Sequence, residues 1–507
     1  MGGNLFETLR GRFPAERSRP FIETPEGRTV SYGDLEAETG RMARLLAELG
    51  VAKGDRVAAI VEKSPEAISL YLAALRAGAV YLPLNTAYQA GEIAYFLDDA
   101  KPKVVVGRPE AEAALGPIAA ECGAVLLTLG AEGEGSLMAR SRDLDPDFAP
   151  LPAAGDDLAA LLYTSGTTGR AKGAMMSHGN LASNARALHQ IWGFRADDVL
   201  LHALPIFHTH GLFVATNCVL LNGTGMLFLP RFEAATVCRL LPRATVMMGV
   251  PTFYTRLLEQ PDFGPETCRS MRLFISGSAP LLEETHRAFE ARTGHVILER
   301  YGMTETGMNT SNPLEGARRA GTVGFPLPEV EVRVADEDGR VLGPGEVGVL
   351  EVRGPNVFKG YWGLPEKTAE EFRPDGFFVT GDIAAIDAAG YVRIVGRAKD
   401  LIISGGFNVY PKEVELVIDE LEGVAESAVI GLAHPDFGEA VTAVVRRETG
   451  REDPDETAVI GAVKGRLANY KVPKRVFFVD ELPRNAMGKV QKNVLRQLYG
   501  AAFEARA

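Results

Sequence analysis

Several features that would place the chain in a special class are scarce or missing. It has four cysteines, Cys122, Cys218, Cys238 and Cys268, and none of them forms a C-x-x-C pair or lies near paired histidines. This spacing argues against a zinc site and a disulfide framework, and it predicts a reducing, cytoplasmic location. Lysine and arginine total 54 against 66 aspartates and glutamates, a net charge of -12, and no long basic run occurs. Nucleic acid is therefore not an expected partner.

Long apolar runs are also missing. The N-terminal segment MGGNLFETLRGRF lacks the apolar core of a signal peptide. The most apolar stretch, LFVATNCVLLNGTGMLFLP at 212–230, is interrupted by two asparagines and two glycines. We therefore expect neither export nor a membrane span.

What the sequence contains is typical of a multidomain α/β enzyme. Its 507 residues exceed what one hydrophobic core usually supports. Apolar runs at 56–62 and 103–107 alternate with helical patterns at 31–50 and 64–78, which predicts parallel strands joined by crossover helices.

The pattern changes twice along the second half of the chain. Short alternating strands separated by D-G, P-G and A-G turns, between 330 and 397, predict a small β-rich unit. After Arg397 two strands and a helix follow another helix, a compact α+β pattern. We predict an N-terminal domain at 1–396, a hinge at 397–400 and a C-terminal domain at 401–507.

The stretch YTSGTTGRAKGA, at 163–174, combines glycines, hydroxyls and a lysine directly after the apolar run LAALLY. Glycines at a strand end let backbone N–H groups surround a phosphate, and the hydroxyls add donors. A Walker A loop is disfavoured, because Gly166 is followed by TTGRAK instead of x-x-x-x-G-K-[ST]. Taken alone, the stretch fits an ordinary surface turn equally well.

Four further motifs decide between these interpretations. In chain order they are YGMTET (301–306), GFFVTGD (376–382), GRAKDLIISGGFNVYPKEVE (396–415) and LPRNAMGKVQK (482–492). Together with the first stretch they resemble the acyl-adenylate-forming, AMP-dependent synthetase superfamily of acyl-CoA synthetases, adenylation domains and luciferases. The resemblance implies an α/β fold: a large N-terminal domain of mixed and parallel sheets flanked by helices, a small β-rich subdomain, and a small mobile α+β C-terminal domain.

The resemblance also implies a two-step reaction. A carboxylate attacks the α-phosphate of ATP to give acyl-AMP and pyrophosphate, and the thiol of coenzyme A then displaces AMP. ATP and coenzyme A are the implied co-substrates, and Mg²⁺ is the implied cofactor, held by Glu305. The residues implied at the nucleotide are Thr164, Ser165, Gly166, Thr167, Thr168, Gly169 and Lys172 at the phosphates, Tyr301 at adenine, Thr304 at the α-phosphate, and Asp382 with Arg397 at the ribose.

Lys489 matches the position of the catalytic lysine of the first step. A lone lysine near a chain end is usually a solvated charge, so this role rests on the motif alone. Ala486 departs from a position where many relatives carry a hydroxyl. Lys399 matches the hinge about which the C-terminal domain of relatives rotates, and Gly405 and Gly406 match a loop lining the pantetheine tunnel. Acylation of Lys489 by a protein acetyltransferase would remove its charge.

The segments between the motifs are unusually polar for a pocket that would hold a hydrocarbon. We predict that His208, which we also count as catalytic, lines the acid pocket with Thr209, Ser278 and Met308. A buried guanidinium needs an anionic partner, so we predict that Arg256 binds a second carboxylate of the substrate. Arg272 is the rival for that role.

PIFHTHGL (205–212) and SGSAPL (276–281) resemble the malonyl-CoA synthetase branch of the superfamily. The resemblance implies the ligation of malonate to coenzyme A, with slower use of methylmalonate, which differs by one methyl group. Another short-chain acyl-CoA synthetase, an adenylation enzyme loading a carrier protein and a luciferase-like oxidoreductase remain alternatives. One or two copies per assembly are both compatible with the sequence.

Overall fold

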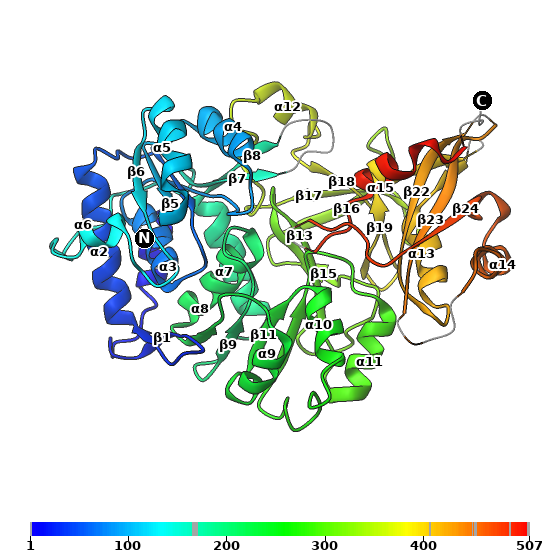
Figure 1. Cartoon of the computed structure of the whole chain (residues 1–507), viewed down its shortest axis with the longest axis horizontal. Coiled ribbons are helices and arrows are strands. Elements are labelled where there is room, and N and C mark those ends of the chain that lie inside the picture. The colour runs from blue at the N-terminus through cyan, green and yellow to red at the C-terminus, as the bar shows by residue number, and fades with distance from the viewer. Residues whose placement is uncertain are drawn as a thin grey trace.

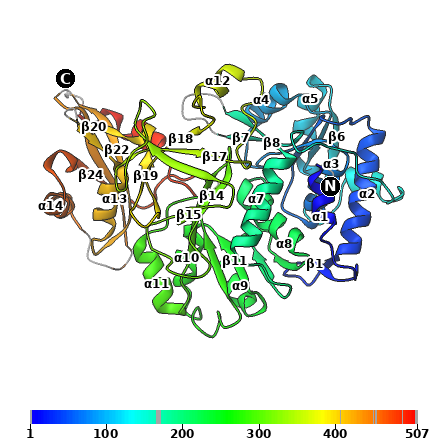
Figure 2. The same cartoon turned by 180° about the vertical axis from the view of Figure 1, so that it is seen from behind.

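The computed structural model describes residues 3–164, 171–404, 407–434, 436–448, 450, 454–485 and 488–503. In this part of the chain helices flank four β-sheets, and the C-terminal sheet lies beside the larger remainder of the molecule (Figures 1 and 2). The predicted α/β fold class, with a large N-terminal part, a small β-rich subdomain and a small α+β C-terminal part, is confirmed.

A six-stranded sheet occupies the N-terminal region, in the order β6-β5-β3-β4-β7-β8. All neighbours are parallel except β7 and β8. Its strands are apolar because helices cover both faces. The strands are β3 (Arg56–Ile60), β4 (Val80–Pro83), β5 (Val104–Gly107), β6 (Val125–Thr128), β7 (Leu158–Thr164) and β8 (Lys172–Ser177), and the helices are α1 (Leu5–Arg10), α2 (Tyr32–Glu48), α3 (Pro65–Arg76), α4 (Ala90–Ala100), α5 (Glu112–Glu121) and α6 (Ser136–Ser141).

A nine-stranded sheet follows, in the order β15-β14-β13-β12-β11-β9-β10-β1-β2. Its central strands are parallel, so their carboxyl ends meet at one edge, where ligands of open α/β sheets bind. The strands are β1 (Pro20–Glu23), β2 (Thr29–Ser31), β9 (Val199–His202), β10 (Gly225–Phe228), β11 (Val246–Gly249), β12 (Leu273–Ser276), β13 (Leu298–Met303), β14 (Gly307–Ser311) and β15 (Phe325–Pro326), and the helices are α7 (His178–Ile191), α8 (Asn217–Asn222), α9 (Ala234–Leu240), α10 (Pro251–Leu258) and α11 (Glu283–Thr293).

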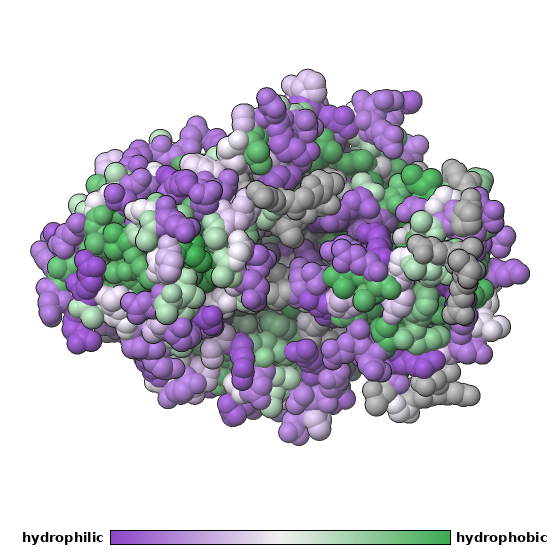
Figure 3. All heavy atoms as spheres, turned by 45° about the horizontal axis from the view of Figure 1, so that its top comes forward, coloured by the Kyte–Doolittle hydropathy of each residue, from purple (hydrophilic) through white to green (hydrophobic). Residues whose placement is uncertain are grey.

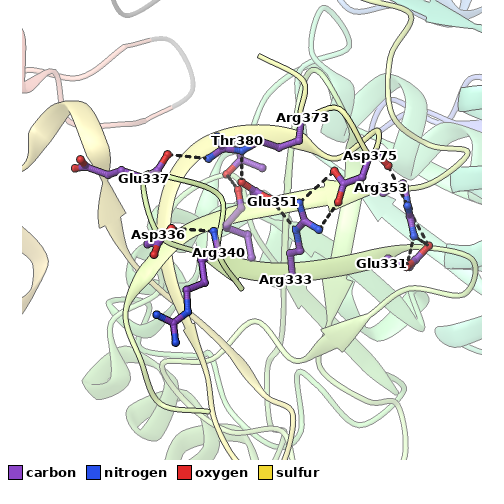
Figure 4. A network of polar contacts seen from close by, with 11 residues as sticks. Glu331, Arg333, Asp336, Glu337, Arg340, Glu351, Arg353, Arg373, Asp375 and Thr380 are labelled. Carbon is purple, nitrogen blue, oxygen red and sulfur yellow. Dashed lines mark hydrogen bonds and ion pairs between the residues drawn. The ribbon is translucent and has the colours of Figure 1, made fainter. Parts of the chain in front are cut away.

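The β-rich subdomain is a four-stranded antiparallel sheet, β16 (Glu331–Ala335), β17 (Gly348–Arg353), β18 (Phe378–Ile386) and β19 (Val392–Arg397), accompanied by α12 (Pro365–Glu370). On one face Glu351, whose side chain is fully buried, accepts hydrogen bonds from Arg333 and Arg373, each at 2.7 Å (Figure 4). A buried carboxylate is tolerated there because two guanidinium groups neutralise it.

Glu351→Ala is expected to lower the free energy of unfolding by about 3 kcal/mol, because it leaves two partly buried arginines without their shared partner. The matched control is Glu331→Ala, which breaks an ion pair with Arg353 that is 61% exposed on the glutamate side and should cost at most about 1 kcal/mol. Denaturant unfolding of both variants checks this. Equal losses of unfolding free energy in the two variants would show that the buried network stabilises the fold no more than an exposed ion pair does.

The C-terminal sheet contains five strands, with β21-β20-β23-β22 in order and β24 pairing with β23. The predicted α+β pattern after Arg397 is therefore confirmed. Its elements are β20 (Ile402–Ser404), β21 (Phe407–Val409), α13 (Pro411–Asp419), β22 (Val424–His434), β23 (Gly438–Arg447), α14 (Glu456–Arg466), β24 (Arg475–Val479) and α15 (Lys492–Tyr499). The exact bounds predicted for the two domains and the hinge stay predictions.

Candidate active site

The carboxyl edge of the nine-stranded sheet brings together segments far apart in the sequence. His208 and Thr209 follow β9, Arg256 lies on the helix that follows β11, and Ser278 follows β12. Met308 lies on β14, next to β13. The surface is hollowed near the middle of the molecule, with hydrophilic residues along much of the rim (Figure 3).

The predicted ribose pair lies on adjacent strands of the β-rich subdomain. Asp382 of β18 is directly opposite Arg397 of β19, and the Arg397 Nε atom is 2.9 Å from the Asp382 Oδ1 atom. The Tyr301 hydroxyl donates to Oδ2 of the same carboxylate at 2.5 Å. The negative charge of Asp382 raises the pKa of Arg397. Three residues from three motifs thus form one contact group, with a buried carboxylate at its centre.

A second group surrounds the lysine of the predicted phosphate loop. The Lys172 Nζ atom is 3.1 Å from Glu371 Oε1 and lies over the ring of Tyr361. The Tyr361 hydroxyl donates to Glu371 at 2.9 Å and to Glu305 at 3.2 Å. One phenol therefore connects two carboxylates. Glu371 and Tyr361 were missed by sequence reasoning, because nothing in the charged run 366–371 distinguishes a functional glutamate.

Glu305 fits a role as a magnesium ligand that shares the ion with phosphates. It is buried, and burial is the main cause of its raised pKa, which a nearby cation would oppose. The residues with described placement include no group of three or more histidines, cysteines, aspartates or glutamates that could hold a metal alone. Mg²⁺ is commonly bound by one or two carboxylates together with substrate phosphates, and the Glu305 carboxylate would supply one such ligand.

Lys489 extends from the C-terminal part of the chain to this same place. Residue 489 as a whole is exposed, and its ammonium group feels the charges of four residues that precede the C-terminal sheet: Arg397, Asp382, Arg300 and Glu305. Burial, followed by the charge of Arg397, lowers the pKa of Lys489 to about 8, and Asp382 and Glu305 partly oppose this shift. The predicted catalytic lysine thus lies within electrostatic reach of the residues predicted to hold the ribose and Mg²⁺.

His208, which is predicted to line the acid pocket, lies within electrostatic reach of this lysine. Burial, then the charges of Lys489 and Arg300, lowers the pKa of His208 to about 3, so the imidazole is neutral at pH 7. His210 Nδ1 is 3.2 Å from the Ser278 hydroxyl, and Ser278 has a φ of 72°, a conformation that costs energy for serine. Both histidines therefore contribute as neutral hydrogen-bonding groups.

Several buried polar atoms around His210 make no hydrogen bond to any described residue. They are Thr209 Oγ1, His210 Nε2, Ser276 Oγ, and Nε and Nη2 of Arg300. Unpaired buried donors are rare in folded proteins and require an explanation. A polar, anionic ligand would satisfy this group.

Arg300 is the buried arginine of the pocket, and the sequence analysis did not single it out. It is 3% exposed, and burial lowers its pKa to about 9. A Cβ atom placed on Gly277 would lie 2.4 Å from the guanidinium carbon, so the glycine makes room for this group. The available signal was a charged pair, Glu299 and Arg300, in the strand LERYGM, with Arg300 directly before the YGMTET motif.

The two arginines considered from the sequence lie in different surroundings. Arg272 is held by Asp198, with its Nε atom 2.7 Å from Oδ1, and it also donates to the Trp192 carbonyl at 3.3 Å. The rival role of Arg272 is therefore excluded, because its guanidinium already has an anionic partner. Arg256 is exposed on α10, so it does not line a closed pocket, and its contact with the acid stays a prediction.

The remaining predicted residues have varied outcomes. Thr164 ends β7, with its hydroxyl 3.5 Å from the Lys172 carbonyl oxygen. Thr304 lies in the turn between β13 and β14, and Met308 is 3% exposed. Lys399 lies in the short segment that joins β19 to β20. Ser165, Gly166, Thr167, Thr168, Gly169, Gly405, Gly406 and Ala486 lie outside the described residues, so their roles stay predictions.

Comparison with known proteins agrees with this geometry. Residues 12–362 match the model of the AMP-binding enzyme family, and residues 413–489 match that of the AMP-binding enzyme C-terminal domain. The chain belongs to this family. It is an acyl-CoA synthetase, a ligase, as its named relatives are.

Individual relatives are similar to the chain over nearly its whole length. The chain is 35% identical to malonate–CoA ligase of Arabidopsis thaliana, over 98% of its own length and 89% of the relative's. It is 37% identical to a feruloyl-CoA synthase from Amycolatopsis, with 97% and 99% coverage. The crystal structure of ATP-bound MatB from Rhodopseudomonas palustris is 57% identical, with a TM-score of 0.97 and coverage of 99% and 100%. None of the helices in the described ranges is both long and apolar enough to cross a membrane.

The lowered pKa of Lys489 gives this acyl-CoA synthetase a testable pH dependence. Only the protonated ammonium can neutralise negative charge, so kcat/KM for the ATP-dependent first step is expected to fall as pH rises through about 8. Pyrophosphate release measured from pH 6 to 10 checks this. Lys489→Arg serves as the control, because a guanidinium stays protonated over this pH range. The variant is expected to be slower than the wild type but to show no fall in kcat/KM as pH rises through about 8. A wild-type profile that stays flat to pH 10 would contradict the assignment.

Proposed function

We propose that this acyl-CoA synthetase is a malonyl-CoA synthetase, which converts malonate, ATP and coenzyme A into malonyl-CoA, AMP and pyrophosphate. The observation that carries the proposal is the buried Arg300 guanidinium, whose Nε and Nη2 atoms have no partner among the described residues. A monocarboxylic acid places its only carboxylate at the α-phosphate and leaves Arg300 unpaired. Malonate has a second carboxylate to pair with it.

Overall identity does not select the acid, because the feruloyl-CoA and malonate relatives are about equally similar to this chain. The chemistry of the pocket residues does select the acid. A feruloyl or hydrocarbon group would leave Arg300, His210 and Ser276 desolvated without compensation, which is costly for a guanidinium above all. The neighbouring His208 and Thr209 extend the same polar wall. The pocket therefore favours a small dianion.

Within this proposal each residue group has one task in the first step. Asp382 and Arg397 would hold the ribose, Lys172 and the hydroxyl residues that follow Thr164 in the sequence would hold the phosphates, and Glu305 would hold Mg²⁺. In this proposal Lys489 contacts both the attacking carboxylate and the α-phosphate. Negative charge concentrates at that point, and a lysine supplies a compact positive charge there.

The second step needs the thiol where Lys489 now lies, so we infer that the C-terminal domain rotates about Lys399 between the steps. Two exposed apolar side chains on the β20–β21 hairpin, Ile403 and Phe407, at 53% and 57%, support this inference. Exposed apolar groups of this size commonly mark a surface that is covered in another state. The predicted tunnel glycines, Gly405 and Gly406, stand between these two strands in the sequence and lie outside the described residues.

Two further expectations belong to this proposal. The lowered pKa of Lys489 increases the fraction of neutral, nucleophilic amine, which favours its acylation by a protein acetyltransferase, and loss of the charge would stop the first step. Mass spectrometry of the protein from its own cell tests this. The monomer or homodimer expected from the sequence is tested by sedimentation.

The proposal is tested by incubating the enzyme with ATP, coenzyme A and one acid at a time, from acetate, propionate, malonate, methylmalonate, succinate and octanoate. We expect free malonyl-CoA as the main product and slower turnover of methylmalonate, whose extra methyl group costs about 1 to 3 kcal/mol. Pyrophosphate release without any free acyl-CoA would instead favour an enzyme that loads a carrier protein.

A further inference from the structure

The catalytic lysine is carried on a short hairpin at the edge of the C-terminal sheet. Arg484 and Val490 form an antiparallel bridge, and inside it the Asn485 N–H donates to the Lys489 carbonyl at 2.9 Å. The Lys489 N–H donates back to the Asn485 side chain at 3.0 Å. Gly488 has a φ of 73°, which closes the turn without strain only for glycine. Within the described residues, these hydrogen bonds hold Lys489 to Asn485.

Arg484 connects this hairpin to the sheet behind it. Its Nη1 atom donates to the Gly488 carbonyl at 2.6 Å, and its Nη2 atom donates to the carboxylate of Glu426 on β22. The two side chains are 29% and 23% exposed, so water screens the pair only in part. One planar guanidinium therefore fixes the residue directly before Lys489 to a strand of the core.

A second ion pair holds the other end of the hairpin. The Lys492 Nζ atom is 2.5 Å from Glu415 Oε1, and the Val429 N–H donates to the same carboxylate oxygen at 2.9 Å. Lys492 lowers the pKa of the buried Glu415 below its usual range, against the effect of burial. The hairpin is therefore attached to α13 on one side and to β22 on the other.

We propose that Arg484, held by Glu426, is a positioning residue for the first half-reaction. The inference rests on the proposed role of Lys489 in adenylate formation. A lysine side chain has four rotatable bonds, so the position of its ammonium depends on where its backbone is fixed. Loss of about 1 Å of precision at a reacting group can cost about 100-fold in rate. The Arg484 attachment supplies that precision, and the second half-reaction, which uses the other domain orientation, does not need it.

The test compares the two half-reactions in Arg484→Met. Pyrophosphate release from malonate and ATP is expected to fall about 10- to 100-fold, while thioester formation from supplied malonyl-AMP keeps the wild-type rate. The control is Arg466→Met, which removes a comparable ion pair, to Glu420 at 2.6 Å, from an exposed site of the same domain. It should change neither rate. Unchanged pyrophosphate release in Arg484→Met would overturn the proposal.

A purely structural role would lower both half-reactions together with the melting temperature. If Arg484→Met lowers both half-reactions and the melting temperature, Glu426→Gln distinguishes a positioning role from a structural one. This variant weakens the ion pair but keeps the Arg484 contact to Gly488. The proposal requires a smaller loss confined to the first half-reaction, and equal losses overturn it. If the wild-type enzyme uses a different acid, the proposed function is refuted but the role of Arg484 is not. The two half-reactions of the variants can then be compared with that acid.

Discussion

Replacing Lys489 with alanine is expected to abolish adenylate formation and leave thioester formation largely intact. The charges of Arg397, Asp382, Arg300 and Glu305 act on the ammonium, and the α-phosphate and the attacking carboxylate would bring further negative charge to the same place. Removal of one preorganised donor at such a site typically costs about 100- to 1,000-fold in kcat. Lys489→Ala should therefore lose at least that much in pyrophosphate release from ATP and malonate.

The second half-reaction provides the internal control for this prediction. Supplied malonyl-AMP and coenzyme A should give malonyl-CoA at close to the wild-type rate, because the thiol attacks from the space that Lys489 leaves. Rapid-quench measurement of both half-reactions on the same preparation checks the expectation. Equal losses in the two half-reactions would refute the division of labour between the two domain orientations.

The second large effect is expected at Arg300. Hydrogen bonds to charged groups contribute about 1.5 to 3 kcal/mol each, so a two-bond contact with the distal carboxylate amounts to about 100-fold or more in kcat/KM. Arg300→Met should lose this factor for malonate and keep its activity toward propionate, which has no second carboxylate. Removing a buried guanidinium whose Nε and Nη2 atoms have no partner among the described residues should not destabilise the fold.

Arg256→Ala is the matched control, because it removes the same group from an exposed position on α10. If Arg300 is the anchor, the exposed substitution changes the preference for malonate far less than the buried one. A larger loss in Arg256→Ala than in Arg300→Met would restore Arg256 as the anchor. Equal and small losses in both would show that neither arginine binds the distal carboxylate.

Much of the nucleotide site could be predicted from the sequence, because its residues lie in short motifs. Tyr301, Asp382 and Arg397 come from three separate motifs, and the structure joins them through one carboxylate. The strands at 56–60 and 104–107 were predictable for a similar reason, since a strand buried on both faces must be apolar throughout.

The residues that were missed depend on contacts that the local sequence does not encode. Glu371 acquires its role from Lys172, which is 199 positions away, and Tyr361 links it to Glu305. Arg300 follows a second charged residue, Glu299, in the sequence, and only the fold shows that the Arg300 side chain is buried beside Gly277. Arg256 lies in a segment that does reach the site, but the helical phase leaves its side chain exposed.

The most direct test of the central claim is the ratio of kcat/KM for malonate to that for propionate, measured on the wild-type enzyme with ATP and coenzyme A. The two acids differ little in size, and only malonate carries a second carboxylate for Arg300. We predict a ratio of about 100 or more, with malonyl-CoA as the identified product. A ratio near or below one would contradict the dicarboxylate assignment and leave an acyl-CoA synthetase for a different acid.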